Sequence, residues 1–202
     1  MATARIAALS LAFFALPAAA FDPFEIQVYD GTADGRGQFG LEMHLNRSRG
    51  EGHVTFEPSY GVTRFWELGG YLQTANGSYE GVKLRSKFVQ SAGEFRFGVN
   101  FELSREPAAW GGEIRPILAF ENDRFLLAAN PIVEFPLAFS PCAMAKVKLG
   151  PVAMGLEYYA TLPDEHYLFE AVDLLAVKNL ELNFAVGEGR ALIAKMIVGY
   201  AF

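Results

Sequence analysis

Strict alternation of apolar and polar residues recurs along most of this chain and constrains its fold more than any other feature. The clearest stretch is "EFRFGVNFEL", where every second residue from Phe95 to Leu103 is apolar and the others are charged, polar or glycine. Successive side chains of a β-strand point to opposite faces, so this stretch predicts a strand with one apolar and one polar face. Helical periodicity is almost absent after the first 20 residues. We therefore expect an all-β protein.

The same alternation predicts about twelve strands. Their expected ranges are 38–46, 52–61, 64–73, 79–89, 94–103, 112–121, 125–135, 143–149, 152–160, 167–174, 179–186 and 191–202. Strands this numerous, joined by regularly spaced turns, are typical of an antiparallel up-and-down β-barrel. Pro58, Pro116 and Pro131 fall inside these ranges. Each proline lacks a backbone donor, so we expect a bulge or a displaced strand boundary at each of them.

The connections between the expected strands fall into two alternating sets. The shorter set is "GVT", "QSAG", "ENDR", "GP" and "AVKN". The interleaved set is mostly longer and consists of "RSRGE", "TANGS", "SREPAAWG", "PLAFSPC", "TLPDEH" and "GEGR". Short turns that alternate with longer loops are typical of a membrane barrel with periplasmic turns and outer loops.

The chain divides into three expected segments. Residues 1–20 contain one basic residue, an apolar run and an Ala-Ala-Ala stretch, which together predict a cleaved signal peptide. The apolar run is shorter than the roughly 18 residues of a membrane-spanning helix. Residues 21–37 are expected to form an N-terminal segment that is a periplasmic tail, an extra strand or a partial plug. Residues 38–202 are expected to form the barrel.

Alternation alone does not say which face of the strands points inward. A soluble barrel buries its apolar face, whereas an outer-membrane barrel presents that face to lipid. A barrel of about twelve strands is too wide for side chains to fill. The polar face carries charges of both signs with mid-strand glycines, and aromatic residues gather toward the strand ends, as interfacial girdles require. These features favour a transmembrane barrel in the outer membrane of a Gram-negative bacterium. The alternative is a soluble periplasmic lipid-binding β protein.

Composition and motifs argue against several other classes of protein. The formal net charge is −6 and no basic patch stands out, so nucleic acid is not an expected partner. The single cysteine, Cys142, cannot form an internal disulfide. No glycine-rich phosphate loop, CxxC pair or HExxH motif is present, so we expect no cofactor. We expect no enzyme, because no serine is placed beside His166 by the sequence; a barrel enzyme acting on lipid is the weaker alternative.

The end of the sequence has its own pattern. "AKMIVGYAF" resembles the C-terminal assembly signal of Gram-negative outer-membrane β-barrels, with aromatic residues at Tyr200 and Phe202. Its glycine is Gly199, whereas the usual signal has one nearer Ile197. With "FEIQVYDG", "GLEMHLN", "FWELGGYLQ", "VKLRSKFV" and "GLEYY", the chain resembles small, poorly characterised proteobacterial outer-membrane barrels and, more loosely, outer-membrane transporters for aromatic compounds. The resemblance implies membrane lipid, lipopolysaccharide and the barrel-assembly machinery as partners.

The strongest group of polar residues is expected to line the lumen. Its candidate lumen and selectivity residues are Lys83, Arg85, Lys87, Glu94, Arg96, Asn100, Glu102, Glu113 and Arg115. Opposed charges of this kind can neutralise one another as ion pairs, or they can form a constriction that selects solutes by sign and size. The leading hypothesis is a small porin or solute channel that passes small solutes or ions. The alternative is a non-conducting structural or adhesive barrel whose outer loops contact lipopolysaccharide or a partner.

The histidines provide a weak candidate for a metal site. If "RSRG" closes the first hairpin, His44 and His53 are cross-strand neighbours, and Glu42 lies two residues from His44. Two imidazoles and a carboxylate can hold a metal ion. No fourth ligand is identifiable, so we favour two polar residues near the outer rim and expect no metal site.

Overall fold

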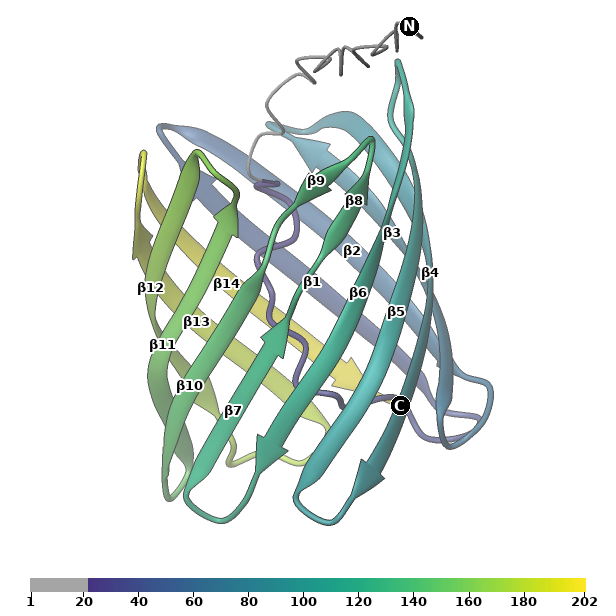
Figure 1. Cartoon of the computed structure of the whole chain (residues 1–202), viewed down its shortest axis with the longest axis vertical. Coiled ribbons are helices and arrows are strands. Elements are labelled where there is room, and N and C mark those ends of the chain that lie inside the picture. The colour runs from purple at the N-terminus through teal and green to yellow at the C-terminus, as the bar shows by residue number, and fades with distance from the viewer. Residues whose placement is uncertain (1–21) are drawn as a thin grey trace, which may run out of the picture.

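The computed structural model describes residues 22–202, which form a closed antiparallel β-barrel (Figure 1). The predicted signal peptide, residues 1–20, lies outside the described residues. Within residues 22–202, no helix is long and apolar enough to cross a membrane. The all-β fold and the barrel architecture expected from the alternation are confirmed.

Neighbouring strands in the sequence pair with one another around the barrel. The strands are β1 (Phe39–Ser48), β2 (Glu51–Gly61), β3 (Trp66–Ala75), β4 (Ser78–Ala92), β5 (Phe95–Arg105), β6 (Trp110–Glu121), β7 (Phe125–Asn130), β8 (Val133–Phe135), β9 (Ala138–Phe139), β10 (Cys142–Leu149), β11 (Val152–Thr161), β12 (Glu165–Leu174), β13 (Leu180–Glu188) and β14 (Leu192–Ala201). Pairing of β14 with β1 and of β5 with β6 closes the ring. The short strand β8 follows β7 along β6, and β9 precedes β10, so the barrel has the expected twelve strand positions.

The expected difference in length between the two sets of loops is wrong. Most connections at both ends contain two to four residues between strands, because residues assigned to the longer loops extend the strands instead. Arg49 and Gly50 alone connect β1 to β2, with φ angles of 49° and 89°. Asn76 and Gly77 connect β3 to β4 in the same way. Positive φ at both central residues is the geometry of a tight type I′ hairpin turn.

The three prolines inside the expected strands lie where the hydrogen-bonded ladder is interrupted. The pairing of β2 with β3 skips Glu57 and Pro58. Pro131 separates β7 from β8, and around Pro116 the strand β6 pairs with neither of them. Each missing donor therefore falls at a gap in the ladder, so the barrel closes without leaving a proline opposite an unmatched acceptor.

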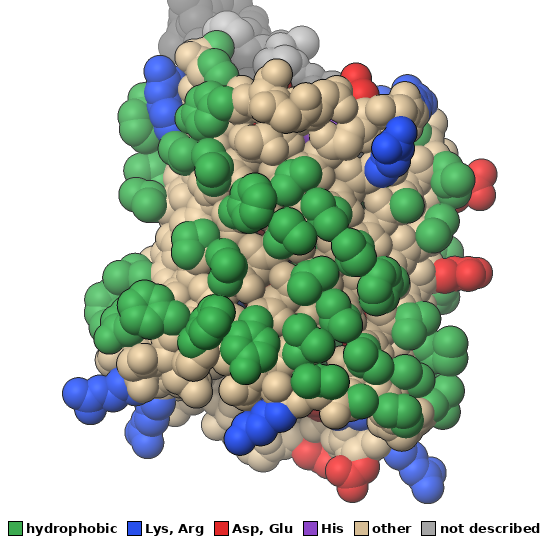
Figure 2. Space-filling view, turned by 180° about the vertical axis from the view of Figure 1, so that it is seen from behind, with side chains coloured by type: hydrophobic (Ala, Val, Ile, Leu, Met, Phe, Trp, Pro, Cys, Tyr) green, Lys and Arg blue, Asp and Glu red, His purple; other side chains and the backbone are tan. Residues whose placement is uncertain are grey.

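The outer face of the barrel is apolar, as Figure 2 shows for one side, with most charged side chains toward the two ends. We call the end with Phe202 the C-terminal end and the other the β8–β9 end (Figure 1). Aromatic side chains pair on the outer face near the C-terminal end: Phe39 with Tyr60, Phe95 with Phe120, and Tyr200 with Phe202. Trp110, Phe135 and Phe139 are exposed near the β8–β9 end. The two groups match the aromatic girdles of a barrel that spans lipid.

The interior is only partly polar, which differs from the lumen that we expected. Buried charged and polar residues dominate β1 to β6, whereas an apolar cluster covers much of β6, β7 and β10 to β13. Phe169 is completely buried in that cluster, and Tyr71 and Tyr167 also point inward rather than to the girdles. An apolar inner wall needs an apolar partner to cover it, and residues 22–38 supply one.

Candidate functional site

Residues 22–38, called the lumen segment below, precede β1 and run through the inside of the barrel (Figure 1). Near the β8–β9 end, the side-chain nitrogen of Asn46 donates to the carbonyl oxygen of Pro23 at 2.9 Å. Near the C-terminal end, the backbone N–H of Gly37 donates to the carbonyl oxygen of Gly61 at 2.7 Å. The segment therefore spans much of the lumen.

The sequence of the lumen segment explains its position between two unlike walls. In an extended chain, alternate side chains point in opposite directions. Ile26 and Val28 pack into the apolar cluster, whereas Glu25 and Tyr29 contact the charged wall. Burying each of the two aliphatic side chains contributes about 1.5–3 kcal/mol relative to leaving it in water. The alternation in "EIQVYD" thus matches a chain held inside a two-sided lumen.

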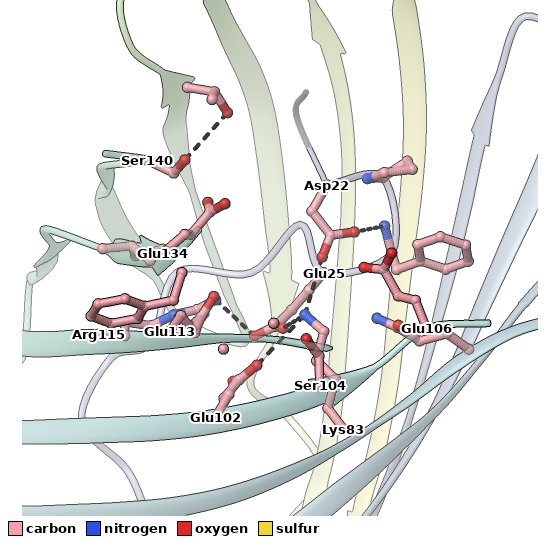
Figure 3. Close-up of a pocket in the computed structure, with 18 of the residues that line it drawn as sticks. Asp22, Glu25, Lys83, Glu102, Ser104, Glu106, Glu113, Arg115, Glu134 and Ser140 are labelled. Atoms are coloured by element: carbon pink, nitrogen blue, oxygen red, sulfur yellow. Dashed lines mark hydrogen bonds and ion pairs between the residues drawn. The ribbon is translucent and has the colours of Figure 1, made fainter. Parts of the chain in front are cut away.

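Glu25 anchors the lumen segment to the charged wall (Figure 3). Its carboxylate lies 2.9 Å from Nη2 of Arg115 and 3.1 Å from Nζ of Lys83. The hydroxyl of Tyr29 donates to the same carboxylate at 3.0 Å. Lys83 also contacts Asp22 at 3.1 Å. A buried carboxylate is costly unless cations and donors surround it, and Glu25 has both.

Tyr29 is the second anchor of the segment. The guanidinium carbon of Arg115 lies 4.4 Å from the centre of its ring, and Nζ of Lys87 lies 5.4 Å from it. Two cations within about 6 Å of one aromatic ring stabilise its position through cation–π attraction. Its hydroxyl contacts that of Tyr71 at 2.5 Å, and its backbone bonds to the side chain of Asn130.

The three basic residues expected on one strand, Lys83, Arg85 and Lys87, all lie on β4 and form ion pairs in the interior. Nη2 of Arg85 lies 2.7 Å from a carboxylate oxygen of Glu57 and 2.7 Å from a carboxylate oxygen of Glu67. Lys87 also pairs with Glu67, at 3.0 Å. The acidic partners of Arg85 and Lys87 therefore come from β2 and β3.

The remaining six members of the predicted lumen group lie in three different places. Glu94 lies in the turn between β4 and β5 and is exposed, so it does not belong to the lumen group. Arg96 pairs with Asp30 of the lumen segment and with Glu121 on β6. These contacts place Arg96 near the C-terminal end, apart from the Glu25 group.

Asn100, Glu102, Glu113 and Arg115 lie together around Glu25. Asn100 donates to Glu102 at 2.7 Å, and Nε of Arg115 donates to Glu113 at 2.8 Å. The β5–β6 register places Glu102 directly opposite Glu113. Two carboxylates at one cross-strand position repel each other, and the nearby cations offset that repulsion.

The largest excess of negative charge lines a cavity of about 530 Å³ near the β8–β9 end (Figure 3). Its carboxylates belong to Asp22, Glu25, Glu80, Glu102, Glu106, Glu113 and Glu134. Only Lys83 and Arg115 contribute basic side chains. A cavity with this lining has a negative potential that attracts cations.

A second cavity of about 330 Å³ lies on the other side of the lumen segment, toward the C-terminal end. Gln27 borders both cavities. Charges of both signs line the second cavity, and several of them are paired: Glu157 lies 2.5 Å from Lys195 and 2.7 Å from Lys146. Lys195 also donates to the carbonyl oxygen of Ile26 at 2.8 Å, so this wall too holds the segment.

The residues around His44 differ from those that the sequence predicted. The two-residue turn at Arg49–Gly50 places Asn46 opposite His53 and Thr55 opposite His44, two residues away from the expected register. His53 instead packs edge-on against Phe24. Glu57, which the sequence did not suggest, joins Glu42 at His44. His44 is completely buried, so its expected place at the outer rim is wrong.

The terminal aromatic residues lie on the outer face. The rings of Tyr200 and Phe202 are 5.0 Å apart, and both side chains are exposed. Gly199 faces inward, paired with Glu42 on one side and Glu181 on the other. A Cβ atom there would lie 2.8 Å from Cγ of Glu42. Close approach of Glu42 thus accounts for a glycine at position 199. The assembly role of Tyr200 and Phe202 stays a prediction.

Sequence reasoning missed Glu25 and Asn130 because their partners are remote in the chain, and it missed Glu57 because the register of β1 with β2 differs from the expected one by two residues. Asn130 contacts a residue 101 positions away, and Glu25 contacts Arg115 across the lumen. The available signals were indirect. "FEIQVYD" alternates as strands do although it precedes them, and Asn130-Pro131 interrupts an otherwise regular strand.

A closed barrel with an apolar outer face, aromatic girdles and a partly charged interior has the architecture of the porin-like outer-membrane β-barrels. Solved structures of that class are similar to this chain. KdgM porin matches with a TM-score of 0.65 and 15% identity over 81% of this chain and 99% of that chain. The COG4313 outer membrane channel from Pseudomonas putida F1 matches with a TM-score of 0.59 and 10% identity over 88% of this chain and 100% of that chain.

At these identities the likeness shows the fold, and the predicted resemblance to porin-like outer-membrane barrels is confirmed at that level. No protein-family model matches the chain, and no curated protein matches it at a significant level.

Proposed function

We propose that this protein is a narrow outer-membrane channel for small cations or small cationic solutes. The observation that carries the proposal is the acidic cavity near the β8–β9 end, which seven carboxylates and two basic side chains line inside an apolar-coated barrel. Confined negative charge raises the local concentration of cations and lowers that of anions.

The lumen segment supports a narrow passage. It separates the two cavities, and the side chain of Gln27 borders both of them. Glu25, Lys83 and Arg115 cross-link the segment to the barrel wall beside this point. Solutes would therefore pass between long side chains held by ion pairs, which favours ions and small molecules. Passage of solutes through such a channel requires no catalysed reaction.

One solved structure of KdgM porin contains a disordered oligogalacturonate. We do not extend that ligand to this chain, because galacturonate units carry carboxylates. The acidic cavity would repel a chain of them.

Conductance in planar bilayers tests the proposal. Under a KCl gradient, the reversal potential should show that K⁺ permeates better than Cl⁻. Replacing three carboxylates of the cavity that have no ion-pair partner among the described residues, as E80Q/E106Q/E134Q, should bring the permeability ratio toward one. The matched control E51Q/D123N/E188Q removes three exposed carboxylates outside the cavity and should leave the ratio unchanged. Anion preference in the wild type would refute the proposal.

The lumen segment also supports a second candidate, a non-conducting barrel. A variant that lacks residues 23–35 separates the two. If the wild type shows conductance steps and the variant shows larger ones, the protein is a narrow channel. If only the variant shows conductance steps, the barrel is closed by its own lumen segment. Absence of steps in both would exclude conduction.

We infer that the barrel lies in the outer membrane of a Gram-negative bacterium, in contact with lipid and lipopolysaccharide after insertion by the barrel-assembly machinery. The apolar outer face and the girdles support this location. Membrane fractionation with heat-modifiable gel mobility tests it. Full recovery in the soluble periplasm without detergent would contradict it.

A further inference from the structure

Glu42, His44 and Glu57 bring three potential metal-binding atoms together on the inner wall of the barrel. Nε2 of His44 lies 3.3 Å from Oε2 of Glu42 and 3.4 Å from Oε2 of Glu57. All three atoms lie within 4.8 Å of one another. His44 is completely buried and Glu57 is 2% exposed. The three side chains thus converge on one point of the inner wall, where Glu42 is 26% exposed and borders a cavity.

The two distances from His44 fit a four-coordinate metal ion. Zinc binds histidine nitrogen at about 2.0–2.1 Å and carboxylate oxygen at about 2.0–2.2 Å, usually in a tetrahedron. Ligand atoms in such a tetrahedron are roughly 3.3–3.5 Å apart. Both measured distances from His44 lie in that range.

The surrounding residues orient the carboxylate of Glu57 toward this point. Its Oε1 atom is held by Nη2 of Arg85 at 2.7 Å. Its Oε2 atom, which faces His44, accepts no hydrogen bond from the described part of the chain. Outer contacts that fix one oxygen of a ligating carboxylate and leave the other for the metal are common in protein metal sites.

The lumen segment supplies a fourth candidate ligand. Nε2 of Gln27 donates to Oε2 of Glu42 at 3.1 Å, and Oε1 of Gln27 has no hydrogen-bond partner within residues 22–202. Rotation of the amide by half a turn exchanges its nitrogen and oxygen at little steric cost. The oxygen then faces the same point as the two carboxylates.

The local charge favours a divalent cation. The carboxylates around the point belong to Glu42, Glu57, Glu67 and Glu181. Arg85 and Lys87 are the basic side chains paired with that group. A neutral His44 leaves an excess of two negative charges, which a divalent ion balances.

We propose that this protein binds one divalent transition-metal ion, with Zn²⁺ preferred, through Glu42, His44, Glu57 and Gln27. Mixed imidazole and carboxylate donors suit zinc, whereas calcium and magnesium require more oxygen ligands. The ion joins β1 and β2 to the lumen segment through Gln27. This inference goes beyond the channel function and does not depend on conduction. It also departs from the expectation of no metal site, because the register replaced His53 with Glu57.

Direct metal titration tests the site. Wild-type protein, folded in detergent micelles and treated with a chelator, should bind one Zn²⁺ per chain in competition with a chromophoric chelator. H44Q and E57Q should each weaken binding at least about tenfold. The matched control H53Q removes the other lumen histidine, which packs on Phe24, and should leave the affinity unchanged. Heat-modifiable gel mobility establishes that each variant is folded.

A spectroscopic measurement on the wild type avoids reliance on variants. Co²⁺ in place of Zn²⁺ should give the strong visible absorption of a four-coordinate ion with nitrogen and oxygen ligands. Q27A should bind Zn²⁺ more weakly than the wild type. With Zn²⁺ present, hydrogen exchange in the lumen segment should be faster in Q27A than in the wild type, and without Zn²⁺ the two should exchange alike. Absence of Zn²⁺ binding by the wild type would indicate that a proton on His44 joins the two carboxylates instead, and equal binding by H44Q would show that the ion binds elsewhere. Either result would overturn the metal site and leave the channel proposal intact.

Discussion

The side chain of Asn130 makes both hydrogen bonds that a β-strand would make with the backbone of Tyr29. Its Oδ1 accepts from the N–H of Tyr29 at 2.7 Å, and its Nδ2 donates to the carbonyl oxygen of Tyr29 at 3.1 Å. Asn130 is completely buried and ends β7, immediately before the break at Pro131. One amide thus connects a gap in the barrel wall to the lumen segment.

Replacing Asn130 with alanine should release the lumen segment. Both backbone groups of Tyr29 would lose a buried partner, which costs about 1–3 kcal/mol of stability. Hydrogen exchange at residues 24–30 should increase. Asn122→Ala is a suitable control, because it also removes two backbone hydrogen bonds but lies in the β6–β7 turn. An equal change in exchange in both variants would contradict this role of Asn130.

Arg85→Met should be among the most destabilising substitutions in the barrel. It leaves the buried carboxylates of Glu57 and Glu67 without their shared guanidinium, and we expect a loss of about 3–5 kcal/mol in the free energy of unfolding. Arg190→Met removes a pair with Glu165 in which Arg190 is half exposed, so its cost should be below about 1 kcal/mol. Denaturant unfolding in lipid vesicles measures both, and similar losses would count against a special role for Arg85.

Glu170→Leu should stabilise the protein in a bilayer. Glu170 lies on the outer face of β12 between the exposed residues Leu168 and Val172. A carboxylate facing lipid is unfavourable, and leucine in its place should add about 1–2 kcal/mol to the free energy of unfolding. Glu188→Leu, at the end of β13, should change little. A loss of stability in E170L would indicate that Glu170 contacts another protein surface.

Gly199→Ala should destabilise the last strand, because the new Cβ would lie 2.8 Å from Cγ of Glu42. The expected loss is about 1–3 kcal/mol, typical of an overpacked site. Gly52→Ala is the matched control on β2, where the nearest atom to a new Cβ is 4.0 Å away. Unfolding midpoints compare the two variants, and equal midpoints would show that Glu42 can move aside freely.

The local alternation of apolar and polar residues was sufficient to predict much of the fold. Alternation located the strands to within a few residues and showed that their two faces differ in polarity. The apolar face was correctly expected to point outward, because a wide barrel cannot fill its interior and aromatic residues lay near the strand ends. The charged residues of β4 were correctly expected to face inward, since side-chain direction in a strand follows from position alone.

The alternation of apolar and polar residues did not predict which charged side chains pair with one another. Arg85 lies opposite Glu102 in the register but pairs with Glu57 and Glu67, because long side chains reach across neighbouring strands. A turn two residues shorter than expected replaced His53 with Glu57 beside His44.

The sequence by itself determined that this chain forms a two-faced barrel, because the period of two is a local property of each strand. Only the tertiary structure decided what fills the lumen and which charges meet there. Those contacts join residues as far apart as Ile26 and Lys195, and they form only when closure of the ring brings opposite walls around the lumen segment.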